Sequence, residues 1–253
     1  MKIILSPAKK MTSDLDNLEP LGLPEFLDQA SDILDWLKKQ SQEELKRLWK
    51  CNDKIAEQNF ERIAHMDLKR RLTPAILAYE GIAYQYMAPA VFEDGQYDYV
   101  QEHLRILSAF YGVLKPMDGV TPYRLEMQAK AVIGGYKDLY ELWGRRLYEA
   151  VRDDSGVIIN LASKEYSKCI EKYLTDNDRY ITIHFCEKSG DKLVTKGTYA
   201  KMARGEMVRF LAEEKIEDPA RIQKYNRLGY VFRGELSTET EYVFERLKSF
   251  IEP

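Results

Sequence analysis

Residues 156–166 read GVIINLASKEY, and this stretch decides the fold class. Residues 156–160 form a continuous apolar run, which is typical of a strand buried on both faces of a sheet. Residues 163–170 have helical character, and Ser163 stands where a helix N-cap is expected. A buried strand that leads directly into a helix indicates a sheet that is covered by helices.

The pattern changes on either side of this stretch. An apolar strand is expected at Lys2–Leu5, and most of the chain between it and residue 156 is helical in pattern. After residue 156, strands and helices alternate. The sequence predicts one α+β domain over residues 1–253, in which a mixed β-sheet is surrounded by helices. The expected helices are 25–39, 42–50, 52–66, 97–111, 137–151 and 198–214, and the expected later strands are 180–185, 192–195, 230–234 and 242–246.

Two helix starts are marked by capping residues. Ser41 is followed three residues later by Glu44, which is the spacing of a capping box. Thr73 and Pro74 resemble an N-cap followed by proline in the first helical position.

Composition excludes several classes of protein. The 253 residues include 38 Lys and Arg against 41 Asp and Glu, so the net charge is −3. That balance excludes a wholly cationic surface but leaves room for one basic cleft. Cys51, Cys169 and Cys186 are too scattered for a disulfide framework, so we expect a cytoplasmic protein. No stretch approaches the roughly 20 apolar residues of a membrane span, and the apolar run at the N-terminus is too short for a signal peptide.

Motifs for metal or cofactor chemistry are lacking in the sequence. The histidines, His65, His103 and His184, are far apart, and no CxxC, HxH or HExxH spacing occurs. We therefore expect neither a dedicated metal site nor a cofactor. The absence of a Walker A loop, GxGxxG and GxSxG leaves no motif that identifies a reaction.

Two strand ends carry polar side chains. Ser6, Lys9 and Lys10 follow the first strand in LSPAKK, residues 5–10, and Asn160 and Ser163 follow the central one. Ligands in open sheets bind beyond the carboxyl ends of the strands, and a hydroxyl with an ammonium group suits a phosphate or carboxylate. The alternative interpretations are a solvated turn at the first end and ordinary helix capping at the second.

A later helix carries basic residues. Lys201, Gly205 and Arg209 stand at positions i, i+4 and i+8, with Arg204 beside them, on what the pattern indicates is an exposed stripe. Glycine within a helix suggests that a partner approaches the backbone closely, and phosphates would fit between the cations. Residues 196–233 contain nine basic and five acidic residues. The alternative is a solvated basic face with an incidental glycine.

Two further segments have a functional and a structural interpretation. Tyr123 and Arg124 follow a proline, and an arginine beside an aromatic ring can stack on a base and bind a phosphate. The alternative there is an ion pair between Arg124 and Glu126. Residues 73–89, with Gly81 at the break, outline a helix-hairpin-helix that could direct amides at a DNA phosphate. An ordinary helical turn is the alternative, since Glu80 adds a negative charge at that point.

Six blocks in order resemble the YaaA family of bacterial peroxide-stress proteins, over Lys2 to about Arg246. These blocks are LSPAKK (5–10), HLRILSAFYGVLKPMDGVTPYRLEM (103–127), DLYELWG (138–144), INLASKEY (159–166), YAKMARGEMVRF (199–210) and GYVF (229–232). The resemblance implies a cytoplasmic protein induced by hydrogen peroxide that limits free intracellular iron. It also implies a single α/β domain of unusual topology with a positively charged cleft, a helix-hairpin-helix and binding of double-stranded DNA.

Three hypotheses follow. The first is a non-enzymatic stress protein that binds double-stranded DNA without sequence specificity, with contacts from Lys9, Lys10, Arg124, Lys201, Arg204, Gly205 and Arg209. The second is an enzyme acting on a nucleotide, nucleoside or flipped base, with Ser6, Tyr123, Asn160, Ser163 and Glu165 lining one pocket. The third is direct sequestration of iron. None of them involves a membrane.

Overall fold

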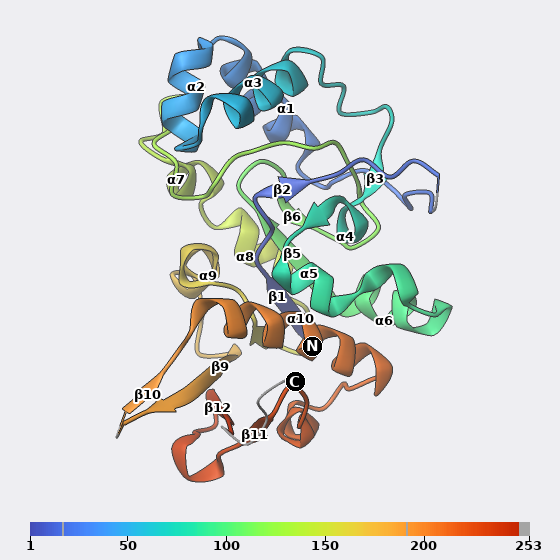
Figure 1. Ribbon diagram of the computed structural model, residues 1–253, viewed down its shortest axis with the longest axis vertical. Helices are drawn as coiled ribbons and strands as arrows, with labels where there is room; N and C mark the ends of the chain where they lie inside the picture. Colours follow the sequence, from blue (N-terminus) through green and yellow to red (C-terminus); the bar gives the residue numbers. More distant parts are fainter. Residues whose placement is uncertain (17, 191, 248–253) are drawn as a thin grey trace.

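The structure is a computed structural model that describes residues 1–16, 18–190 and 192–247. Its main sheet has the strand order β11-β12-β9-β8-β1-β5-β6, and β10 pairs with β9 (Figure 1). The five central strands are parallel: β1 (Lys2–Leu5), β5 (Leu104–Ser108), β8 (Val157–Asn160), β9 (Arg179–Ser189) and β12 (Glu241–Arg246). Antiparallel strands β6 (Gly112–Leu114), β10 (Lys192–Val194) and β11 (Tyr230–Phe232) complete it. The predicted mixed sheet with surrounding helices is confirmed.

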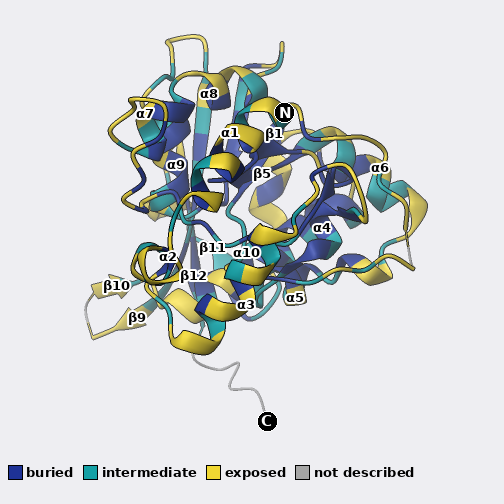
Figure 2. Ribbon diagram, turned by 90° about the horizontal axis from the view of Figure 1, so that it is seen from above, coloured by how far each residue is buried: buried dark blue, intermediate teal, exposed yellow. Residues whose placement is uncertain are grey.

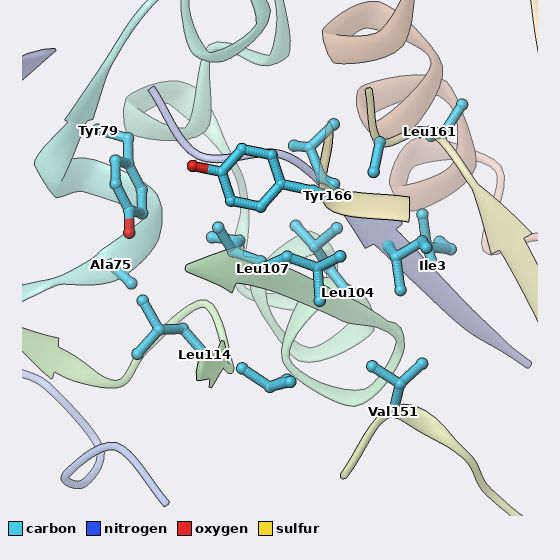
Figure 3. Close-up of a cluster of buried hydrophobic side chains, with 14 of the residues drawn as sticks. Ile3, Ala75, Tyr79, Leu104, Leu107, Leu114, Val151, Leu161 and Tyr166 are labelled. Atoms are coloured by element: carbon cyan, nitrogen blue, oxygen red, sulfur yellow. The ribbon is translucent and has the colours of Figure 1, made fainter. Parts of the chain in front are cut away.

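Strand β1 lies at the centre of this sheet. Ile3 is opposite Leu104 of β5 on one side and opposite Ile159 of β8 on the other. All four residues of β1 are buried, which explains why its sequence after Lys2 is apolar rather than alternating. Figure 3 shows Ile3, Leu104 and Leu161 in one buried cluster with Tyr166.

Helices cover the sheet on both sides. In Figure 2, α7, α8 and α9 lie to one side of β1 and β5, whereas α4, α5 and α6 lie to the other. The helices are α1 (Leu27–Lys38), α2 (Gln42–Trp49), α3 (Asp53–Ala64), α4 (Ala75–Ala78), α5 (Ile82–Met87), α6 (Asp94–His103), α7 (Leu139–Trp143), α8 (Arg146–Val151), α9 (Lys164–Glu171) and α10 (Gly197–Glu213). Helix α10 runs beside α5 and also contacts α6 and β9 (Figure 1).

Short elements connect these layers. Strand β2 (Lys10–Met11) pairs with β4 (Tyr79–Glu80), and β3 (Thr73–Pro74) pairs with β7 (Gly119–Val120). Three 3₁₀ turns occupy Pro89–Val91, Pro219–Lys224 and Gly234–Leu236.

The capping box at the start of α2 is confirmed. The Ser41 hydroxyl accepts the backbone N–H of Glu44 at 3.3 Å, and the Glu44 carboxylate accepts that of Ser41 at 2.8 Å. The helix start expected at Thr73 and Pro74 is wrong, because these residues form strand β3 and the helix begins at Ala75.

The helix expected over 97–111 is also wrong in its second half. Helix α6 ends at His103, and the chain continues at once into β5, whose five residues are all buried. A strand that is apolar on both faces cannot be distinguished from a buried helix by periodicity alone. The turn after β5 is fixed by the Ser108 hydroxyl, which accepts the N–H groups of Phe110 and Tyr111 at 3.2 and 2.8 Å.

The helix expected over 137–151 is divided. Gly144 ends α7 with φ of +53°, in the left-handed region that favours glycine, and α8 starts at Arg146.

Candidate functional site

A cavity of about 400 Å³ lies beyond the carboxyl ends of β1 and β8. The chain passes from β1 to β5 on one side and later returns to β8 on the other side, so these strand ends border a topological switch point. We call this space the cationic cavity. It is lined by five basic residues (Lys9, Lys10, Arg124, Lys201 and Arg204), three acidic residues (Glu80, Glu126 and Glu165), Ser6, Ser163 and an apolar and aromatic floor that includes Ile82, Ala83, Tyr84, Tyr123 and Tyr166.

Two serines join the strand ends at this cavity. The Ser6 hydroxyl accepts the backbone N–H of Ser163 at 2.8 Å and donates to the Ser163 hydroxyl at 3.1 Å. The Tyr84 hydroxyl of α5 donates to the Ser6 carbonyl oxygen at 3.1 Å. Ser163 precedes α9 as predicted, but its side chain does not cap the helix, because it bonds Ser6 instead.

Arg204 brings an uncompensated charge to the cavity. Its Nε atom is buried and has no hydrogen-bond partner among residues 1–16, 18–190 and 192–247. Burial lowers the pKa of its guanidinium, which means that the charged form is poorly solvated. A buried donor of a cation without a partner is costly, so the half-buried Arg204 favours an anion in the cavity.

Arg124 is a second arginine of the cavity whose Nε has no hydrogen-bond partner among the described residues. This Nε is likewise buried, and the Nη1 of Arg124 donates to the Lys9 carbonyl oxygen only at 3.5 Å. The expected alternative of an Arg124–Glu126 pair is wrong, since Glu126 instead pairs with the Lys9 ammonium at 2.7 Å.

The remaining cations of the cavity differ in their surroundings. Lys10 forms an ion pair with Glu80, which connects β2 to β4. Lys201 is exposed on α10 and lines the same cavity. Of the five cations that line the cavity, Lys9 and Lys10 are thus already paired with carboxylates.

Glu165 is a carboxyl group in a cationic cavity. Burial raises its pKa, and the nearby Glu126 carboxylate raises it further, although the backbone N–H of Gln128 donates to it at 3.2 Å. A carboxyl with a raised pKa can hold or release a proton nearer to neutral pH.

Tyr123 contributes its ring rather than its hydroxyl. Its hydroxyl bonds the Ser108 hydroxyl at 2.7 Å and the Tyr79 hydroxyl at 2.9 Å inside the core. Burial raises the pKa of Tyr123 to about 12, so it stays protonated. Tyr84 and Tyr166 line the same floor, and neither was predicted from the sequence because both have the pattern of ordinary core positions.

Asn160 does not line the cationic cavity. It is buried, its side-chain oxygen accepts the Ala162 N–H at 2.9 Å, and it faces a neighbouring cavity. The predicted pocket of five polar residues is therefore assembled only in part: Ser6, Tyr123, Ser163 and Glu165 line one cavity without Asn160.

The exposed stripe expected on α10 is wrong at Gly205. Gly205 is buried against α5, where an added Cβ would lie 1.8 Å from the Ala83 carbonyl oxygen. Arg209 lies outside the cationic cavity, and its Nε donates to Glu213 at 2.7 Å. The stripe fails because α10 packs on more than one side, against α5, α6 and β9.

The helix-hairpin-helix expected over residues 73–89 is not formed. The two-residue strand β4 stands between α4 and α5, and it pairs with β2. Helix α4 is a single turn of four residues, so two consecutive helices joined by a hairpin turn are missing there. Gly81 precedes α5 and lines the cationic cavity next to Ala8.

Two further observations concern metals and membranes. Within the described ranges, no three His, Cys, Asp or Glu side chains are grouped as a metal ion would require. Over the same residues, no helix combines the length and the apolar character needed to cross a bilayer.

Comparison with known sequences gives consistent matches over most of the chain. The family model described as "Peroxide stress protein YaaA" matches residues 1–236. A UPF0246 protein of Agathobacter rectalis is 70% identical over 246 residues, which are 97% of this chain and 99% of the relative. UPF0246 proteins of Lachnoclostridium phytofermentans and Desulfitobacterium hafniense are 57% and 51% identical over 244 residues each, covering 96% of this chain and 96% and 97% of the relatives.

Proposed function

This chain belongs to the YaaA family of peroxide stress proteins, and from that premise we propose that it acts in the peroxide response by binding double-stranded DNA through its cationic cavity. The observation that carries the proposal is the half-buried Arg204 side chain, whose buried Nε has no partner among the described residues. A phosphate supplies the negative charge and the acceptor oxygens that such a group lacks.

The surrounding residues support a phosphate ligand. Arg124 adds a second guanidinium with a buried unpartnered Nε, again within the described ranges, and Lys201 adds an exposed ammonium. Contacts of this kind depend on the phosphate backbone rather than the bases, so binding without sequence specificity is expected. Lys9 and Lys10 lie on the same cavity and extend its positive charge, although Glu126 and Glu80 reduce their contribution.

A salt titration tests this proposal. The affinity of the full chain for a labelled 20-base-pair duplex is measured by fluorescence anisotropy over a series of salt concentrations. Each phosphate contact contributes about −0.9 to the slope of log affinity against log salt, so contacts by Arg204, Arg124 and Lys201 give a slope of about −3. A flat salt dependence, or no binding at low salt, contradicts DNA binding.

The proposed role extends to iron. The protein would limit free intracellular iron during peroxide stress, in a cytoplasmic setting, as its family resemblance implies. Equilibrium dialysis against ferrous iron separates two routes. Stoichiometric uptake of iron indicates sequestration by the protein itself, whereas no uptake indicates an indirect effect.

A second function, catalysis on a nucleotide, nucleoside or flipped base, is favoured by Glu165. Its carboxyl group has a raised pKa and shares the cavity with Ser6 and Ser163. Incubation of the protein with nucleotides, followed by mass spectrometry, tests it. New products that disappear with Glu165→Gln support an enzyme, and unchanged nucleotides contradict it.

A further inference from the structure

A second cavity of about 410 Å³ adjoins the cationic cavity. It lies beyond the carboxyl end of β8 and along the first half of β9, beside the start of β12, and we call it the polar cavity. Its lining includes Asn160, Lys164, Thr182, His184, Thr195 and Glu241. It is similar in volume to the cationic cavity, and both volumes fall in the range of small-molecule sites.

One side chain and one loop form the wall between the two cavities. Arg204 lines both. In the loop from β8 to α9, Leu161 and Ser163 line the cationic cavity, whereas Ala162 and the first residue of α9, Lys164, line the polar cavity. Arg204 is therefore the side chain that both cavities share.

The polar cavity has a different chemical character. Apart from Arg204, its ionisable side chains contact one another: Lys164 pairs with Glu171, and the His184 ring contacts the Glu241 carboxylate. Thr182 and Thr195 add hydroxyl groups, and Asn160 adds an amide. Paired charges and neutral hydrogen-bonding groups suit an uncharged polar ligand, such as the hydroxyls of a sugar and the edge of a base.

We infer that the ligand is a chain of at least two nucleotide units, held with its internal phosphodiester at Arg204 and with one nucleoside in each cavity. This inference rests on the proposed binding of nucleic acid. Because the wall keeps the two nucleosides apart, they cannot stack on each other. The segment that enters the cavities is therefore unpaired, either a single strand or a locally opened duplex.

A pair of ligands with equal charge tests the inference. Thymidylyl-(3′→5′)-thymidine has one phosphodiester and two nucleosides, whereas thymidine 5′-(methyl phosphate) has one phosphodiester and one nucleoside. Their affinities for the full chain are measured by isothermal titration calorimetry. We expect the dinucleoside to bind at least about tenfold more tightly, because it alone fills both cavities.

Variants then test whether the second nucleoside binds in the polar cavity. Thr182→Val and Thr195→Val each remove a hydroxyl of the polar cavity while keeping the shape of the side chain. Loss of one hydrogen bond weakens binding by roughly threefold to tenfold. We expect that loss for the dinucleoside and less than a twofold change for the single nucleoside. Thr198→Val is the matched control, since Thr198 is exposed on α10 and lines neither cavity.

Each outcome decides the inference. Equal affinity for the two ligands, or an advantage of the dinucleoside that both threonine variants leave unchanged, overturns it while the proposed function stands. Binding of duplex DNA without binding of either small ligand overturns it as well. No binding of the small ligands or of DNA removes the proposed function itself. Melting curves of the variants establish that they are folded.

Discussion

Gly205 of α10 lies so close to Ala83 of α5 that a Cβ at position 205 would be 1.8 Å from the Ala83 carbonyl oxygen. This contact brings the two helices together at the cationic cavity, because Ala83 lines that cavity and Arg204 is the residue next to Gly205. The glycine that was predicted to admit a phosphate is thus a packing residue. It places its neighbour, Arg204, at the wall of the site.

Gly205→Ala should destabilise the fold. The added methyl group overlaps a backbone oxygen, so α5 and α10 must move apart, and overpacking of this kind costs about 3 kcal/mol. For a chain of this size we expect the melting temperature to fall by roughly 6–12 °C. Gly197→Ala on the same helix is the control, since a Cβ added there would have nothing within 4 Å and the change should be neutral or slightly stabilising. Equal melting temperatures for the two variants would contradict the close approach.

Arg204→Gln should weaken DNA binding and stabilise the free protein. The variant loses a charged contact to phosphate, which corresponds to roughly 10- to 100-fold in affinity, and the salt slope becomes about 0.9 less steep. It also removes a half-buried cation that has no partner for its Nε among the described residues, so the melting temperature should rise.

Arg209→Gln is the matched control for that variant. Arg209 lies five residues further along α10 and pairs with Glu213 outside the cationic cavity. We expect less than a twofold change in DNA affinity. If Arg209→Gln weakens binding as much as Arg204→Gln, the DNA lies on a different face of α10.

Asp118 should make stability depend on pH. Burial raises the pKa of its carboxyl to about 6. The hydrogen bond from the Lys115 N–H and the charges of Lys115 and Arg105 lower this pKa, but by less than burial raises it. The folded state therefore holds this proton more tightly than the unfolded state does. As pH rises from about 4 through about 6, Asp118 lowers the free energy of unfolding, by up to about 3 kcal/mol.

Asp118→Asn should remove this contribution, since the amide oxygen can still accept the Lys115 N–H. Urea denaturation at pH 4.5, 6 and 7.5 compares the two proteins, and the difference between them isolates Asp118 from other carboxyls. The variant should exceed the parent in stability by about 1 kcal/mol at pH 4.5 and by about 3 kcal/mol at pH 7.5. A variant that is less stable at every pH would show that Asp118 is favourable when charged.

The three cysteines should differ in their reaction with peroxide. Burial raises the pKa of the Cys169 thiol to about 12, so at pH 7.5 only on the order of 10⁻⁵ of it is thiolate. Cys51 and Cys186 are partly exposed. Peptide mass spectrometry after brief treatment with hydrogen peroxide should find oxidation at those two residues and none at Cys169 until urea is added. Early oxidation of Cys169 in the folded protein would contradict its burial.

Local sequence determined much of the fold. The run of residues 156–160 predicted β8 because both faces of that strand are covered, and the spacing of Ser41 and Glu44 predicted the start of α2 because a capping box is a local structure. The same reasoning failed at 104–108, where a strand buried on both faces has no periodicity to separate it from a helix.

Sequence by itself also identified most of the polar and charged side chains of the cavity, since Ser6, Lys9 and Ser163 follow strand ends and parallel strands end at one edge of a sheet. Only the tertiary structure decided which cations are free to bind a ligand. Lys9 pairs with Glu126 and Lys10 pairs with Glu80, whereas the Nε of Arg204 has no hydrogen-bond partner within the described residues. The pairing of a charge depends on what distant segments place beside it, and its own neighbours in the sequence do not contain that information.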